Sequence, residues 1–349
     1  MEKSPQPVVK NILFPVLLCC FLLIGVKTKI MADSIGSIYT IDSVSIDPQN
    51  PRIIYAGLLS GFYKSTDSGG SWQLSSDGNS HSISRLAFAP SDSAIIYAYS
   101  SMGIVKSIDH GRNWHIKKEW SEDSIYSIAI DPNNSEIVYA GGEGYIYKSV
   151  NGGETWEMLA NDISGTITLA ADTKKSSVLY AGTKENYNDG IFKSTDGGKT
   201  WVAINNGIEP DGFGYYAFVD IVVSKHNSNM IYAVFEDYIY KSVNGGKSWK
   251  KLKNSPGETD DVQHRYMILT NKPNIMYLDT SWKIYRSENG GKSWMSIEKA
   301  GSSSYFLAVD PQNTKTIYTG GTEVLHKSTD GGKTWRKIIK GLPFDEKEY

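Results

Sequence analysis

Short apolar runs, each ended by glycine, proline or asparagine, recur along almost the whole chain. The clearest set comprises residues 127–131 (Ser-Ile-Ala-Ile-Asp), 137–140 (Ile-Val-Tyr-Ala) and 145–148 (Tyr-Ile-Tyr-Lys), followed by a fourth run at residues 156–159. Runs of four to six residues that are rich in Val, Ile and Tyr and bounded by turn residues predict β-strands. No window of ten residues shows the 3.6-residue apolar spacing of a helix, so we expect an all-β protein.

The sequence Ser-x-Asp/Asn-x-Gly-x-Ser/Thr/Asn-Trp, here called the turn motif, occurs seven times at intervals of 41 to 48 residues. A fixed period of this length indicates an array of supersecondary units. Four antiparallel strands in each of seven units predict a seven-bladed β-propeller. The last unit contains its own fourth strand at residues 335–339, so ring closure needs no strand exchanged between the chain ends.

The chemistry of the turn motif is structural. Its Asp or Asn side chain can accept hydrogen bonds from the backbone N–H groups of the second or third residue after it, which closes an Asx turn. The next Gly permits a positive φ, and the Trp ring is expected to be buried beneath the turn. An amide caps as well as a carboxylate but would replace a catalytic acid poorly. The acid or amide and the Trp of the seven copies are Asp67 and Trp72, Asp109 and Trp114, Asn151 and Trp156, Asp196 and Trp201, Asn244 and Trp249, Asn289 and Trp294, and Asp330 and Trp335.

The charge balance of the chain argues against one class of function, the binding of nucleic acid. The 349 residues include 36 Lys and Arg and 38 Asp and Glu, a net charge of −2, which gives no basic footprint for nucleic acid. Because the repeat runs through nearly all of the chain, we expect one monomeric propeller domain over residues 33–349. The only cysteines, Cys19 and Cys20, precede it, so the domain has neither disulfides nor thiolate metal sites.

Residues 1–32 have the pattern of an export signal. Lys3 and Lys10 precede an apolar run at residues 12–26, and a polar, charged stretch follows at residues 27–29. An apolar run of this length is too short to span the hydrocarbon core of a bilayer as a helix. We therefore expect a secretory signal peptide, with an uncleaved N-terminal anchor as the alternative. The propeller would then be periplasmic or extracellular, and it would contact a membrane only through an uncleaved segment.

The copies at Ser194–Trp201 and Ser328–Trp335, which both read Ser-Thr-Asp-Gly-Gly-Lys-Thr-Trp, resemble the Asp-box, also called the bacterial neuraminidase repeat (BNR repeat). Propellers with this repeat include sialidases, xyloglucan-active glycoside hydrolases, the sortilin ectodomain and the photosystem II assembly and stability factors. In blade number, length and export signal the chain is most similar to the photosystem II assembly and stability factors, and it resembles the group formed by these and the sortilin-like propellers. This resemblance implies a non-catalytic propeller that recognises a protein or glycan partner.

The hydrolase branches of this resemblance imply residues that the chain does not place well. Sialidases resemble one another in three arginines that clamp the substrate carboxylate, but here only Arg85 and Arg265 begin expected inner strands. Xyloglucan hydrolases use an Asp in the loop after the second strand of the first blade, and residues 58–61 (Leu-Leu-Ser-Gly) contain no carboxylate. A divergent glycoside hydrolase with carboxylates at the channel mouth is therefore the second hypothesis.

Length variation among the repeats falls on one face of the expected propeller, here called the loop face. Residues 205–216 and 254–264 are insertions between blades, and residues 183–190 lengthen a hairpin. Loops on a rigid scaffold are where binding residues concentrate, and aromatic rings beside carboxylates can stack on sugars or grip a protein. The alternative is that the aromatic residues pack on one another. The candidate binding residues are Tyr187, Asp189, Phe213, Tyr215, Tyr216, Asp260, Asp261, His264, Arg265 and Trp282.

A second set of candidates opens the expected inner strands, which face the axial channel. A glycosidase would need two carboxylates about 5–9.5 Å apart, and Asp42 and Asp220 are the acids available; they can equally form ion pairs with the arginines. We expect no metal and no cofactor, because the six histidines are scattered and no calcium loop or phosphate-binding Gly loop is evident. The channel candidates are Asp42, Arg85, Tyr126, Asp220, Tyr266 and Tyr305.

Overall fold

The computed structural model describes residues 40–58, 60–75, 83–100, 103–119, 125–142, 145–159, 163, 166–183, 190–209, 218–235, 237–256, 264–280, 283–298 and 304–345. Only the backbone is described at residues 83–85, 119, 126, 166–167, 218–219, 264–265 and 304–305. The chain divides into two compact units, Met1–Gly36 and Ser37–Tyr349. All of the described residues belong to the second unit.

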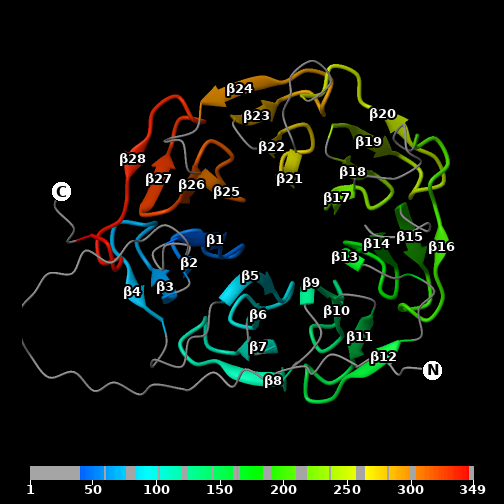
Figure 1. The fold of residues 1–349 in the computed structure, drawn as a ribbon, viewed down its shortest axis with the longest axis horizontal. Coiled ribbons are helices and arrows are strands. Elements are labelled where there is room, and N and C mark those ends of the chain that lie inside the picture. Colours follow the sequence, from blue (N-terminus) through cyan, green and yellow to red (C-terminus); the bar gives the residue numbers. More distant parts are fainter. Residues whose placement is uncertain are drawn as a thin grey trace, which may run out of the picture. The chain divides into compact units, whose positions relative to one another are not determined.

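The described residues form seven antiparallel sheets, and each sheet contains four strands that follow one another in the sequence. Figure 1 shows the sheets arranged as the blades of a ring, with the first strand of each blade innermost. The predicted all-β, seven-bladed propeller with four antiparallel strands per blade is confirmed. The strands of blades one to seven, in order, are β1 (Ile41–Ile46), β2 (Ile54–Leu58), β3 (Gly61–Ser65), β4 (Gln73–Leu74); β5 (Ile83–Phe88), β6 (Ile96–Ser100), β7 (Gly103–Ser107), β8 (His115–Glu119); β9 (Ile125–Ile130), β10 (Val138–Gly142), β11 (Ile146–Ser149), β12 (Glu157–Leu159); β13 (Thr166–Ala171), β14 (Leu179–Thr183), β15 (Gly190–Ser194), β16 (Val202–Ala203); β17 (Phe218–Val223), β18 (Ile231–Phe235), β19 (Ile239–Ser242), β20 (Lys250–Lys251); β21 (His264–Leu269), β22 (Met276–Thr280), β23 (Lys283–Ser287), β24 (Met295–Glu298); and β25 (Ser304–Val309), β26 (Ile317–Gly321), β27 (Val324–Ser328), β28 (Arg336–Lys337).

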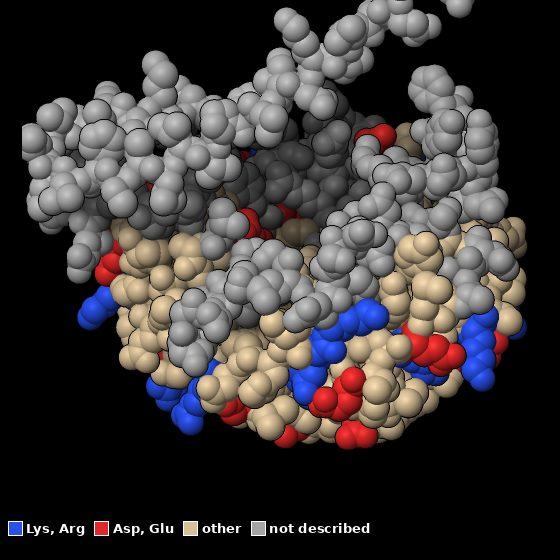
Figure 2. All heavy atoms as spheres, turned by 60° about the horizontal axis from the view of Figure 1, so that its bottom comes forward, with Lys and Arg blue, Asp and Glu red and all other residues tan. Residues whose placement is uncertain are grey.

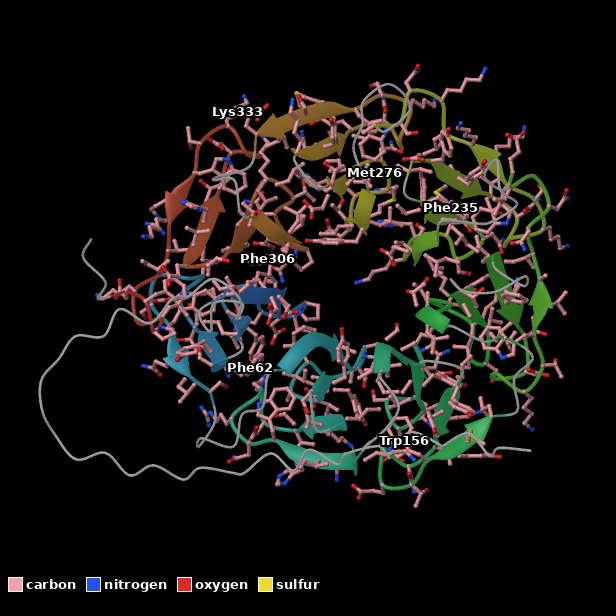
Figure 3. The ribbon with its side chains drawn as sticks, in the orientation of Figure 1. Phe62, Trp156, Phe235, Met276, Phe306 and Lys333 are labelled. Atoms are coloured by element: carbon pink, nitrogen blue, oxygen red, sulfur yellow. The ribbon has the colours of Figure 1, made fainter. Side chains whose placement is uncertain are left out.

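The core lies between the blades rather than within one layer. Each of the seven buried apolar clusters joins side chains from two neighbouring blades. The second strands β2, β14, β18 and β22 are buried at every residue because each blade packs between two others. The outermost strands β4, β16, β20 and β28 are exposed at both of their residues. In Figure 3, Phe306 lies at the inner side of its blade, whereas Lys333 lies at the outer rim.

The turn motif has one hydrogen-bond pattern in all seven copies. In the fourth copy the Ser194 hydroxyl donates to Oδ1 of Asp196 at 2.8 Å, and the N–H of Gly198 donates to that hydroxyl at 2.8 Å. The N–H of Thr200 donates to the same carboxylate at 3.0 Å. The capped N–H thus belongs to the fourth residue after the acid, and the N–H of the third, Lys199, adds a bond of 3.1 Å. The expected bond from the third residue is therefore present in this copy, and the bond from the fourth was not expected from the sequence.

The Trp side chains of the turn motif are less uniformly buried than the sequence suggests. Trp72 and Trp249 are each 3% exposed, whereas the other five, including Trp156 in Figure 3, are half-buried. Trp72 and Trp249 differ because the segment that follows the last strand of the preceding blade lies on each of them. The indole N–H of Trp249 donates to the carbonyl of Ile204 at 2.6 Å, and its backbone N–H donates to the carbonyl of Asn206 at 2.9 Å. The first residues of the insertion at 205–216 are therefore part of the scaffold.

A Tyr and a basic residue face one another in every blade, and in blades one to four and seven the base also donates to a backbone carbonyl of the next blade. The Tyr stands in the second strand, and the base that faces its ring stands in the third. In blade two, Nζ of Lys106 lies 5.1 Å from the ring centroid of Tyr97 and donates to the carbonyl of Gly152 in the next turn motif at 2.9 Å. A cation over an aromatic ring is attracted to its negative face. The seven pairs are Tyr55 and Lys64, Tyr97 and Lys106, Tyr139 and Lys148, Tyr180 and Lys193, Tyr232 and Lys241, Tyr277 and Arg286, and Tyr318 and Lys327.

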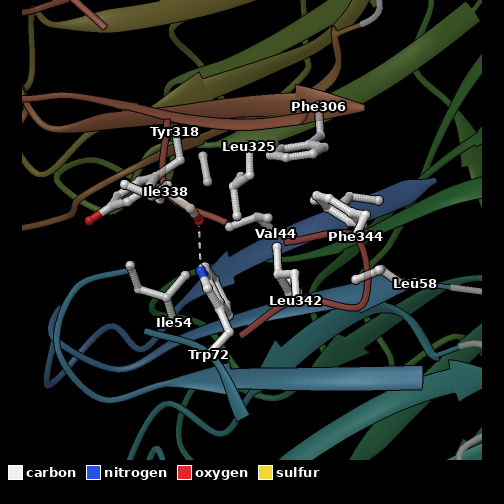
Figure 4. Close-up of a cluster of buried hydrophobic side chains, with 13 residues drawn as sticks. Val44, Ile54, Leu58, Trp72, Phe306, Tyr318, Leu325, Ile338, Leu342 and Phe344 are labelled. Carbon is white, nitrogen blue, oxygen red and sulfur yellow. Dashed lines mark hydrogen bonds between the residues drawn. The ribbon is translucent and has the colours of Figure 1, made fainter. Parts of the chain in front are cut away.

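The ring closes between blades seven and one without a shared strand, as the sequence predicts. The segment after β28 covers Trp72, whose indole N–H donates to the carbonyl of Ile338 at 2.9 Å (Figure 4). Leu342 and Phe344 pack into the same buried cluster. Lys327 crosses the seam and donates to the carbonyl of Ser68 at 3.0 Å. Side-chain packing and hydrogen bonds therefore hold blades seven and one together.

Candidate binding site

Each innermost strand contains one residue that has no partner in the neighbouring strand. In β1 the register passes from Ile41 to Ser43, so Asp42 is unpaired. The other six innermost strands have the same one-residue shift near their first residues. A β-bulge of this kind re-aims a side chain, and such bulges are frequent at barrel rims and beside active sites. The seven unpaired positions, here called the bulge ring, are Asp42, Arg85, Tyr126, Ile167, Val219, Arg265 and Tyr305.

The bulge ring differs from the scaffold positions in its chemistry. The facing pair is a Tyr and a Lys in six blades and a Tyr and an Arg in the other one. At the bulge ring the backbone is again the same in every blade, but the residues are an acid, two arginines, two tyrosines and two aliphatic residues. Because the residue varies while the backbone does not, the bulge itself does not require one type of residue.

Five of the sequence candidates occupy the bulge ring, at the end of the channel next to the loop face. They are Asp42, Arg85, Tyr126, Arg265 and Tyr305. His264 is the first residue of β21 and immediately precedes the bulge in that strand. Of these six residues, only Asp42 has a described side chain. Sequence reasoning missed Ile167 and Val219, because an aliphatic residue in an apolar strand carries no sign of a bulge.

Asp42 is the acidic member of the bulge ring. Its side chain is exposed, yet the surrounding protein excludes part of the water, and this desolvation raises the pKa of its carboxyl above the ordinary value. A raised pKa favours the protonated form of a carboxyl. Asp42 is therefore more easily kept protonated than a carboxyl in open solvent, and a protonated carboxyl can donate a hydrogen bond.

Asp220 and Tyr266 directly follow the bulge in their strands and join neighbouring blades. Asp220 accepts the N–H of Ile221 at 2.9 Å and the N–H of Met267, in the next blade, at 3.4 Å. The hydroxyl of Tyr266 donates to the carbonyl of Leu307, also one blade further on, at 3.4 Å. Ser127 contacts the backbone of the next blade in the same way. The structure therefore shows a scaffold role for these two channel candidates.

Eight candidates of the loop face remain. Tyr187, Asp189, Phe213, Tyr215, Tyr216, Asp260, Asp261 and Trp282 lie outside the described residues. The strands that carry these loops are described, and they belong to blades four, five and six. Three of the five acids among the candidates are in these loops, and the hydrolase hypothesis requires two of the five to lie close together.

The described residues offer few sites of other kinds. Within these ranges, no three His, Cys, Asp or Glu side chains come together as ligands for a metal ion. The same part of the chain contains no helix that is long and apolar enough to cross a bilayer. On the face drawn in Figure 2, Lys and Arg lie in small groups interspersed with Asp and Glu.

The fold and the repeated turn define the class of the protein as a seven-bladed β-propeller. Residues 237–343 match the family described as Sortilin-Vps10 (sortilin, neurotensin receptor 3). No curated protein sequence matches the chain. The expected similarity to the sortilin-like and photosystem II factor-like group is confirmed by this match and by one of the solved structures described next.

Among solved structures, the chain is similar to the GH74 xyloglucanase from Xanthomonas campestris, with a TM-score of 0.71 and 15% identity over 88% of this chain and 55% of that one. It therefore spans about half of that enzyme's length. YCF48 bound to D1 peptide matches with a TM-score of 0.56 and 18% identity over 74% of this chain and 82% of that one. The extracellular domain of a putative one-component system from B. thetaiotaomicron matches with a TM-score of 0.64 and 12% identity over 83% and 38%. At these identities the likeness establishes the fold alone.

Proposed function

We propose that this protein is an exported, non-catalytic propeller that binds a protein or glycan partner at the loop face, with the bulge ring as the floor of the site. The observation that carries the proposal is the contrast between uniform scaffold positions and the varied bulge ring. Arg and Tyr are the residue types that most often dominate the binding energy of an interface, and the bulge ring contains two of each.

The comparisons support binding and export without deciding between partners. One similar structure is described as bound to a peptide, another as a xyloglucanase, and a third as an extracellular domain. The export pattern of residues 1–32 agrees with the third. A propeller that presents variable loops around a fixed ring suits recognition of an extended polypeptide or of an oligosaccharide.

The proposal is tested by replacing Arg85, Arg265 and Tyr305 with alanine in one variant. The purified propeller serves as bait for envelope proteins and for an immobilised glycan array. We expect the triple variant to lose at least tenfold in recovery of every ligand that wild type enriches, because a few interface residues hold most of the binding energy. The matched control replaces Arg336 and Lys337, which are exposed on β28, and should bind like wild type. Equal recovery by the triple variant and wild type would show that the bulge ring is not the site.

A divergent glycoside hydrolase is the second candidate, favoured by the position of Asp42 and the raised pKa of its carboxyl. Glycosidases need an acid that stays protonated near neutral pH. Incubation with xyloglucan oligosaccharides and with sialosides, followed by measurement of released sugar, separates the two functions. Hydrolysis by wild type that Asp42→Asn removes would support the enzyme, and no hydrolysis of either substrate leaves the binding function.

A further inference from the structure

The end of the channel opposite the bulge ring contains a cavity of about 790 Å³. Its walls come from the last residues of the innermost strands and from the turns that follow, and they include Ile46, Phe88, Ile130, Leu307 and Val309. Cavities of about 300–1,000 Å³ that are mainly apolar and have a few polar groups are typical of small-molecule sites. The function proposed above makes no use of this cavity.

The rim of the cavity is divided into two halves. The second residue after each innermost strand lines the cavity. In blades one, two, three and seven this residue is a proline: Pro48, Pro90, Pro132 and Pro311, respectively. These four blades are consecutive in the ring, so their prolines form one continuous apolar arc. In blades four, five and six the same position is Thr173, Lys225 or Asn271. The polar residues therefore also form one continuous arc.

Charge follows the same division. The turns of blades four to six, at residues 172–177, 224–229 and 270–274, contain four lysines and one acid, a net charge of +3. The corresponding turns of the other four blades, at residues 310–315, 47–52, 89–94 and 131–136, contain five acids and two basic residues, a net charge of −3. A ligand across this rim would experience a field that draws a negative group to the polar arc.

Two polar side chains of the rim are available to a ligand. Lys225 and Asn271 are exposed and, among the described residues, neither side chain has a hydrogen-bond or ion-pair partner. Thr173 is already engaged, since its hydroxyl donates to the carbonyl of Ser224 at 3.0 Å. The one acid in this arc, Asp172, is 1% exposed and accepts the N–H groups of the next two lysines through Oδ1. Asp172 lines the cavity, but its other oxygen, Oδ2, is buried and has no hydrogen-bond partner in the described part of the chain, so the carboxylate is not exposed to a ligand.

We propose that this cavity binds an amphipathic organic anion, a molecule with an apolar body and one carboxylate. The apolar body lies against the aliphatic and aromatic walls, and the carboxylate meets the ammonium group of Lys225 and the amide of Asn271. An ammonium donor to a carboxylate makes one of the stronger hydrogen bonds in proteins. The site is independent of the loop face and of any partner bound there.

The probe is dodecanoate, titrated below its micellar concentration into the purified propeller in a calorimeter. We expect one saturable site per chain and affinity about tenfold higher than for 1-dodecanol, because the alcohol lacks the charge that Lys225 recognises. Dodecyltrimethylammonium should bind more weakly than either. Hexanoate should bind well over tenfold more weakly than dodecanoate, because it buries fewer methylene groups.

Variants of the exposed Lys225 locate the site without disturbing the core. Lys225→Gln should lower the affinity for dodecanoate to that for the alcohol, and Lys225→Arg should retain most of it. Lys333→Gln, at an exposed lysine on the outer rim, and the alanine variant of the bulge ring should bind like wild type. Unsaturable binding, equal affinity for all three head groups, or an unchanged Lys225→Gln would each overturn the proposal. Loss of dodecanoate binding in the bulge-ring variant would also overturn it, by placing the ligand at the other end of the channel.

Discussion

Asp196 and Asn151 close two copies of the turn motif, and the hydrogen bond between their side chain and the following Thr hydroxyl runs in opposite directions. The hydroxyl of Thr200 donates to Oδ2 of Asp196 at 2.6 Å, whereas Nδ2 of Asn151 donates to the hydroxyl of Thr155 at 2.9 Å. A hydroxyl can do both because it is donor and acceptor at once. This explains at the level of single atoms why the turn motif accepts either residue, and why its acids need no catalytic explanation.

The acid and amide copies should differ in their response to pH. The hydroxyl and N–H of Thr200 lower the pKa of Asp196 to about 2, below the value of about 3.9 of an unfolded Asp. A carboxyl with a lowered folded pKa adds stability above pH of about 4 and loses that contribution as the pH falls toward about 2. We expect Asp196→Asn to match wild type in urea unfolding at pH 7 and to lose less stability than wild type between pH 5 and pH 2.5.

The control for this prediction keeps the acid and removes its partner. Thr200→Val deletes the hydroxyl bond to Oδ2 and should raise the pKa of Asp196, so its unfolding midpoint should fall at pH 7 as well. An Asp196→Asn protein that loses as much stability in acid as wild type would show that other groups govern the acid response.

At the scale of the element, the pairs of Tyr and base explain why a basic residue precedes the last residue of the third strand in every blade. Lys106 lies over Tyr97 and donates to the carbonyl of Gly152, so one side chain joins two strands of blade two to the turn of blade three. Lys106→Met keeps the length of the side chain and removes both interactions. We expect a loss of about 1–3 kcal/mol in the free energy of unfolding, measured with urea.

Lys199→Met is the matched control, since Lys199 is exposed in a turn motif. Its unfolding free energy should stay within about 0.5 kcal/mol of wild type. If Lys106→Met behaves like this control, the contact between the blades contributes nothing measurable.

The strands and five of the seven bulge-ring residues could be predicted from sequence, but the bulges themselves could not. Turn residues such as Pro132 and Gly141 divide the chain into runs whose length and composition leave only strands possible. A bulge shifts the alternation of apolar and polar side chains along a strand by one residue. This shift can be seen in a sequence only where one face of the strand is polar. The innermost strands pack between two blades, so Ile167 and Val219 stand among other apolar residues and the shift leaves no trace. The residues that divide the rim into an apolar and a polar arc can be read from the sequence. That they form two continuous arcs becomes visible only when the blades are arranged in a ring.

At the scale of the whole molecule, the seam between blades seven and one is the place where the ring is not covalently continuous. Gly341 has φ of +87°, and a Cβ there would lie 2.3 Å from the carbonyl oxygen of Trp72. Gly341→Ala should therefore detach the last segment. We expect Trp72 to become exposed, as a red shift of fluorescence at temperatures below the main unfolding transition.

Substitutions at two other glycines separate the effects of backbone strain, of the steric clash and of the position at the seam. Gly331→Ala has a similar φ of +82° but open space around the new methyl group, so it should cost about 1–2 kcal/mol from backbone strain alone. Gly207→Ala has the same clash, 2.4 Å from the carbonyl oxygen of Trp249, at a junction that the chain crosses. Gly207→Ala should lower the temperature of the main unfolding transition, and no separate transition should precede it. An early transition in Gly207→Ala, or none in Gly341→Ala, would contradict the role of the seam.

Each blade is built from one uninterrupted stretch of chain. In propellers whose ends share a blade, a change in blade number would have to preserve the pairing of the first and last strands. In this chain, an unequal recombination that duplicates or deletes one period in the coding sequence adds or removes a complete blade, and every remaining strand keeps its partner. The number of blades is therefore open to change in a single genetic event, and the repeat itself supplies the similar stretches at which such recombination occurs.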